Sequence, residues 1–141
     1  MRIKTNLEER PPAFTVAHEG TEAVIVFYTD VQEEQRDEGV SFSAISWTMN
    51  RPWTDGIEGR IEAKRDVWLA LAQQEAYDQA AEEVRATRNA LLYDSDCLMA
   101  ADYPISDEAR ERATAYRQAL RDISDQPGFP YEVIWPTFPG L

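Results

Sequence analysis

The spacing of apolar residues changes near residue 62, and this change constrains the fold more than any other feature of the sequence. Before it, residues 41–49 place apolar side chains on one face at every second position, as in a half-buried strand. After it, apolar residues recur at helical spacing over residues 62–96, which contain no proline. The sequence therefore predicts an α+β protein: a small antiparallel β-meander, then a long helix, a second helix and an extended C-terminal tail.

Two more strands are predicted before residue 41. Phe14–Ala17 and Ala23–Thr29 flank a turn signal at residues 19–20, which favours a β-hairpin. The charged stretch 31–39 is too polar for a core, so it predicts an exposed loop or an extension of the strands. The glycines and proline that follow allow at most one short strand, over residues 57–61.

The helical part is predicted to bury one side of each helix. In the long helix the expected apolar stripe is Val67, Leu71, Ala80, Val84, Thr87 and Leu91, with Trp68, Ala72, Tyr77 and Ala81 beside it. The second helix starts with Ser106 as its N-cap, and its apolar face is Ala109, Ala113, Tyr116, Leu120 and Ile123. Prolines exclude a helix from the last residues, which we expect to lie across the helices and to bury Ile134 and Trp135.

The charge of the chain argues against nucleic acid as a partner. The formal net charge is −12, from 26 acidic and 14 basic side chains, and the sequence contains no basic stripe. Phosphate binding depends on Lys and Arg, so this chain would repel nucleic acid. The longest apolar run, residues 23–28, is far shorter than the ~18 residues of a membrane helix. We expect neither nucleic acid nor a membrane as a partner.

No residue pattern predicts a catalytic, metal or cofactor site. His18 is the only histidine, and a zinc site needs several ligands, so an ordinary strand histidine is favoured. Cys97 has no histidine close in sequence, which favours a packed or semi-exposed thiol over a nucleophile. The carboxylates of residues 33–38 lack the apolar surroundings that raise a pKa for acid catalysis. We expect a non-enzymatic protein without a cofactor.

Aromatic side chains in the β-rich part are the candidates for contact with a partner protein. They are Tyr28, Trp47 and Trp53. Exposed aromatic residues anchor many protein interfaces. The competing interpretation is that these large side chains fill the core.

A series of short motifs runs in fixed order from Arg88 to Pro139. The residues that carry it are Arg88, Leu91, Leu92, Asp96, Pro104, Ser106, Tyr116, Arg117, Leu120, Arg121, Trp135 and Pro136. The series resembles the C-terminal module of the phage tail assembly chaperone family, which includes tail fibre assembly proteins. Two positions differ, because Cys97 and Ala113 stand where that family often has tryptophan.

The resemblance implies a chaperone that binds a phage tail or tail-fibre protein in the host cytoplasm and helps it to fold or assemble. Whether the chain then stays on the virion tail is left open. The alternative is a structural virion component, an adaptor or decoration protein of the tail or fibre. We expect residues 1–61 to recognise the partner and residues 62–141 to form the helical module.

The arginines of this module have two possible roles. They could form bidentate ion pairs that fix the connection between the helices, or they could be solvated with little net effect on stability. The arginines are Arg88, Arg117 and Arg121, and the possible acceptors are Asp96, Asp102 and Asp122.

Overall fold

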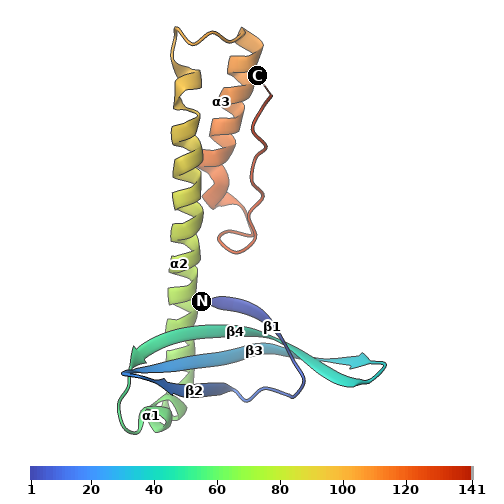
Figure 1. The fold of residues 1–141 in the computed structure, drawn as a ribbon, viewed down its shortest axis with the longest axis vertical. Helices are drawn as coiled ribbons and strands as arrows, with labels where there is room; N and C mark the ends of the chain where they lie inside the picture. The colour runs from blue at the N-terminus through green and yellow to red at the C-terminus, as the bar shows by residue number, and fades with distance from the viewer. Residues whose placement is uncertain (141) are drawn as a thin grey trace. The chain divides into compact units, whose positions relative to one another are not determined.

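A computed structural model describes residues 1–140, and over these the chain forms an antiparallel sheet followed by helices (Figure 1). The elements are β1 (Arg2–Leu7), β2 (Phe14–Glu19), β3 (Glu22–Arg36), β4 (Gly39–Pro52), α1 (Ile57–Ala63), α2 (Arg65–Asp94), η1 (Asp96–Met99), α3 (Asp107–Arg121) and η2 (Asp122–Asp125). The predicted α+β class is confirmed. The chain divides into two compact units, Met1–Gln79 and Ala80–Leu141, with the boundary inside α2.

The sheet has the strand order β1-β4-β3-β2, and every neighbouring pair is antiparallel. The predicted hairpin joins β2 to β3 through a two-residue turn at Gly20 and Thr21. Gly20 has φ 63°, a left-handed conformation that glycine adopts without steric cost. The charged stretch 31–39 is a strand extension rather than a loop, because β3 and β4 pair as far as Arg36 and Gly39.

Two segments differ from the sequence-based expectation. Residues 57–61 are helical, so the predicted short strand is wrong. Ile57 and Ile61, one helical turn apart, are both buried, and Gly56 in a left-handed conformation precedes the helix. The strand β1 was not predicted, because its alternation is weak; its order comes from pairing with β4, where Ile3 lies opposite Ser46.

The core of the first unit lies on one face of the sheet. Along β3, Ala23, Ile25 and Phe27 are fully or almost fully buried, whereas the residues between them are only half-buried. Their neighbours across β4 on the same face include Trp47 and Met49, which are also buried. The buried residues contributed by the helices of this unit are Ile57, Ile61, Ala72 and Ala76.

The side of α2 that is buried differs from the predicted stripe. Val67 and Leu71 are 58% and 47% exposed, whereas Ala72, Ala76 and Ala81 are almost completely buried. Adjacent residues point ~100° apart around a helix, so the core-facing stripe lies one residue further along. Ala72 and Ala81, which were predicted to lie beside the stripe, are therefore on the buried side of the helix, and Ala76 joins them.

In the second unit α3 packs with the end of α2, and the tail runs beside α3 (Figure 1). The predicted apolar face of α3 is confirmed, because Ala109, Ala113, Tyr116, Leu120 and Ile123 are all buried. The expectation for the tail is wrong in part. Trp135 is half-buried, but Ile134 is 81% exposed, since successive side chains of an extended chain point to opposite sides.

Candidate interaction module

Arg117 on α3 holds the end of α2. Arg117 is 8% exposed, and its Nη1 donates to the Leu92 carbonyl (2.6 Å) and to Ser95 Oγ (2.7 Å). Its Nη2 donates to Asp96 Oδ1 at 2.6 Å. The last carbonyls of a helix have no partner within the helix, so this guanidinium satisfies one of them directly. Of the three predicted arginines, Arg117 forms the expected pair with Asp96.

Arg110, which sequence reasoning missed, holds the rest of the connection between α2 and α3. Its Nη1 donates to the carbonyls of Leu98 and Ala100, each at 3.0 Å, and its Nη2 donates to the carbonyl of Tyr103 at 3.3 Å. The acceptors are all backbone groups, so no acidic partner in the sequence signals this role. Arg110 lies two turns before Arg117 on the same side of α3. This spacing was the one feature of the sequence that could have indicated that both arginines face the same connection.

The start of α3 has the predicted cap. Ser106 Oγ accepts a hydrogen bond from the Ala109 N–H at 3.1 Å, which satisfies one of the free donors of the first turn. The backbone N–H of Glu108 and the Ser106 hydroxyl stabilise the Glu108 carboxylate and lower its pKa. Pro104 is exposed just before this cap.

The remaining helical motif residues pack or face solvent. Leu91 and Leu92 are half-buried, Leu120 is fully buried, and Tyr116 is 6% exposed. Burial, with a contribution from the nearby Asp94 charge, raises the pKa of Tyr116.

The other two predicted arginines do not form the expected ion pairs. Arg88 is half-buried, and its Nε donates to Asn89 Oδ1 at 3.0 Å. Arg121 is exposed at the end of α3. Of the other possible acceptors, Asp122 accepts from Gln118 Nε2 at 2.9 Å.

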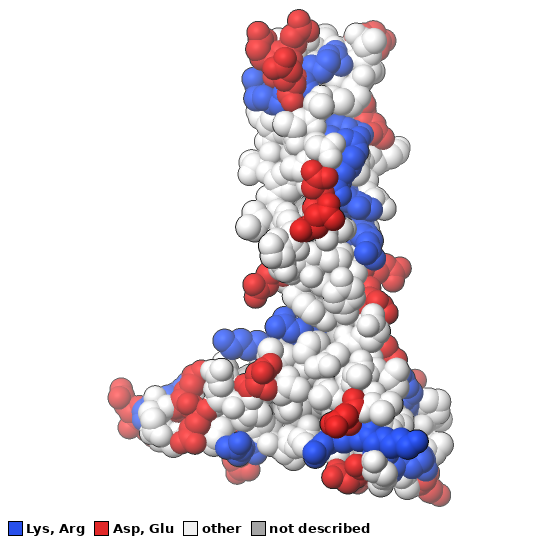
Figure 2. All heavy atoms as spheres, turned by 180° about the vertical axis from the view of Figure 1, so that it is seen from behind, with Lys and Arg blue, Asp and Glu red and all other residues white. Residues whose placement is uncertain are grey.

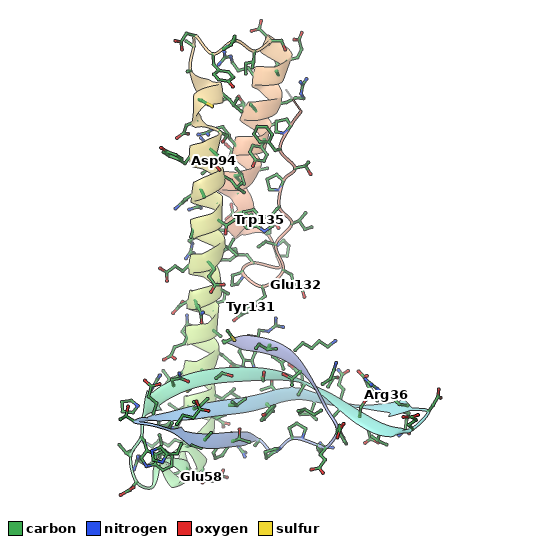
Figure 3. The ribbon with its side chains drawn as sticks, viewed as in Figure 1. Arg36, Glu58, Asp94, Tyr131, Glu132 and Trp135 are labelled. Carbon is green, nitrogen blue, oxygen red and sulfur yellow. The ribbon has the colours of Figure 1, made fainter. Side chains whose placement is uncertain are left out.

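The tail is attached through hydrogen bonds between a side chain and its backbone and through an aromatic contact. The side-chain amide of Gln126 brackets Ile134, donating to its carbonyl (2.8 Å) and accepting from its N–H (2.7 Å). Phe138 meets the Tyr116 ring edge-on, with centroids 5.3 Å apart. Trp135 and Pro136 lie half-buried between these two attachment points (Figure 3).

Gly128 makes the turn into the tail possible. A Cβ at this position would lie 2.1 Å from the backbone carbonyl oxygen of Glu132. The Gly128 carbonyl also accepts from the Glu132 N–H at 2.7 Å, which closes the turn. The close approach requires a residue without a side chain.

The three aromatic candidates of the sheet lie in different places. Trp47 is 8% exposed, and its Nε1 donates to Thr29 Oγ1 at 2.9 Å in the core. Trp53 is half-buried and stacks on His18, with ring centroids 3.9 Å apart. Tyr28 is half-buried on the opposite face of the sheet from Trp47.

Other kinds of site are not formed by the described residues. Within residues 1–140 no three His, Cys, Asp or Glu side chains are grouped as a metal site, and Cys97 is exposed. None of the helices in that range combines the length and the apolar character of a bilayer span. On the face shown in Figure 2, acidic and basic side chains are interspersed.

The helical module can be compared with known families. Residues 81–140 match the family model of the phage tail assembly chaperone protein. The match confirms the resemblance and indicates a role in phage tail assembly, which favours a non-enzymatic protein. It spans almost the whole of the second compact unit and none of the sheet. No curated protein and no solved structure matches the chain.

Proposed function

We propose that this chain binds a phage tail or tail-fibre protein in the host cytoplasm and keeps it soluble until it assembles. The observation that carries the proposal is the family match over residues 81–140. The partner class follows from the family, which acts in tail assembly.

The proposed mechanism uses binding energy alone. Tail and fibre proteins rich in β-structure fold slowly through contacts between distant residues, and their unpaired strand edges aggregate. A strongly charged partner that covers such a surface would keep the unassembled chain in solution. The net charge of −12 suits this role, because a high net charge favours solubility.

Within the chain we assign partner recognition to residues 1–61 and the shared helical module to residues 62–141. The sheet supports this division, because it lies entirely outside the residues that match the family. A family-wide module joined to a different recognition part would let related chaperones serve different partners.

Co-expression tests the proposal. The full chain should move a tail or tail-fibre protein of the same phage from the aggregate into the soluble fraction and co-elute with it, without added ATP. An unrelated acidic protein of similar size is the control. If the chain changes neither the solubility nor the elution of any of these proteins, the chaperone function is wrong. A fixed copy number in purified particles would then identify it as a structural virion component.

A further inference from the structure

The two faces of the sheet have different surroundings. One face carries Phe27, Trp47 and Met49 and is buried, and Arg51, on the same face, forms an ion pair with Glu75 of α2. The start of α2 passes behind β3 and β4 in Figure 1. The opposite face is largely accessible to solvent, because its side chains on β1, β2 and β3 are half-buried or exposed, whereas the small Ala44 and Ser46 of β4 are buried there.

The strand register identifies the residues of this accessible face. Val26 lies opposite both Thr15 and Thr48, and Tyr28 and Ile3 both lie opposite Ser46. Directly opposed residues in antiparallel strands point to the same side of a sheet. We call this surface the open sheet face; its main residues are Ile3, Thr15, Val24, Val26, Tyr28 and Thr48.

The centre of the open sheet face is uncharged, although the chain is strongly acidic. Its apolar members include Val24, Val26 and Ile3, the last of which is 48% exposed. Carboxylates lie at both ends of its β3 row. Glu22 precedes Val24 by two residues, and Glu33 lies opposite Phe42, which is on the same face of β4 as Ser46. An uncharged centre with an acidic rim is the anatomy of a protein interface rather than of a solvated sheet face.

The acidic rim favours a different protein over a second copy of this chain as the molecule that covers the open sheet face. A second copy of the chain would bring the same acidic rim against this one, which like-charge repulsion disfavours. A partner with β-branched or aromatic side chains at its centre and Lys or Arg around them complements both parts of the surface. Two sheet faces of this kind pack with their side chains interdigitated.

We propose that the open sheet face docks a β-sheet surface of the tail or tail-fibre partner that has an uncharged centre and a basic rim. This inference rests on the proposed function and names the surface through which it acts. Trp47 has no part in this contact, because it belongs to the buried face. Tyr28 is the one aromatic candidate that does.

Lysine substitutions in the full chain test the docking surface. Val26→Lys and Ile3→Lys each place a charge in the apolar centre, and Ile3 is on the edge strand, where the cost to folding is low. Val67→Lys is the matched control, because Val67 is 58% exposed on α2, away from the sheet face. Binding is measured with a tail or tail-fibre protein of the same phage that co-elutes with the unsubstituted chain, and circular dichroism confirms folding.

We expect both face variants to weaken binding at least ~10-fold and the control to change it less than ~2-fold. Raising the salt concentration should weaken binding of the unsubstituted chain, because it screens the acidic rim. Equal binding by Ile3→Lys, Val26→Lys and the control would overturn the inference while leaving the proposed function intact. A dimer of the unsubstituted chain that Val26→Lys dissociates would overturn the choice of occupant. If the unsubstituted chain binds none of the tail proteins, the proposed function fails, and the inference fails with it.

Discussion

The two compact units differ in what holds them together and in what they leave exposed. The sheet unit has an apolar core on one face and an uncharged, accessible surface on the other. The helical unit is fixed by two arginines, Arg110 and Arg117, that donate to the connection between its helices. Among the motif residues that resemble the chaperone family, three are buried (Tyr116, Arg117 and Leu120) and five are half-buried (Arg88, Leu91, Leu92, Trp135 and Pro136). We propose that these residues serve the fold of the module and that the surface selecting a partner lies in residues 1–61.

The largest effect that tests this comparison is expected from Arg117→Ala. The change removes the donor to Leu92 and Ser95 and leaves Asp96 without its ion partner. A buried acceptor that loses its donor costs ~1–3 kcal/mol, whereas Asp96 is 61% exposed, so the loss of its ion pair adds little. Hydrogen exchange of the α3 amides should report this loss, whereas the amides of β3 should keep their protection.

Arg121→Ala is the matched control on the same helix, because Arg121 is exposed. It should change the free energy of unfolding by less than ~0.5 kcal/mol. Equal effects of the two substitutions would show that the buried arginine is no more important than a surface one.

A smaller effect is expected from Gly128→Ala, which tests how the tail is attached. The added Cβ would lie 2.1 Å from the Glu132 carbonyl oxygen, so the turn must open. Overpacking of this kind costs ~1–3 kcal/mol. Fluorescence of Trp135 should shift toward the solvent-exposed value in a variant that keeps only this tryptophan. Gly59→Ala, with open space around its Cβ, is the control. An unchanged spectrum would show that the turn does not position the tail.

The smallest effect concerns the pH dependence of the helical unit. The pKa of Glu108 is lowered in the folded chain from its ordinary value of 4.5. The carboxylate therefore stabilises the fold above the ordinary value, and this contribution is lost as the pH falls through the lowered pKa. Glu108→Gln should lower the melting temperature at neutral pH and match the parent in acid. A difference that persists unchanged in acid, or one that Glu111→Gln reproduces, would contradict this assignment.

The sequence predicts the helices and strands that are determined by local signals within their own residues. The β2–β3 hairpin has a glycine turn between β-rich segments, and α3 has a Ser106 cap and a regular apolar face. Elements that depend on distant contacts were missed or displaced. The strand β1 is ordered by β4, and the buried positions of α2 include alanines, whose small side chains give a weak hydrophobic signal.

The hydrogen bonds of Arg110 and Arg117 also depend on contacts between residues far apart in the sequence, so the sequence predicts them only in part. The Arg117–Asp96 pair was among the alternatives because both side chains carry opposite charges. The role of Arg110 depends on carbonyl groups that every residue has, so only the fold reveals which of them converge on it. The residues of the open sheet face likewise cannot be identified from the sequence, because only the strand register shows which of them lie next to one another.

Side-chain footprinting of the complex tests the division between the units most directly. Hydroxyl radicals would label the full chain alone and bound to its co-expressed tail or fibre partner. Tyr28 reports on the open sheet face, and Tyr93, 79% exposed, reports on the helical unit. The proposed division of labour predicts that the partner protects Tyr28 from oxidation and leaves Tyr93 reactive. Protection of Tyr93 with Tyr28 unchanged would contradict it and would place partner recognition in the helical module.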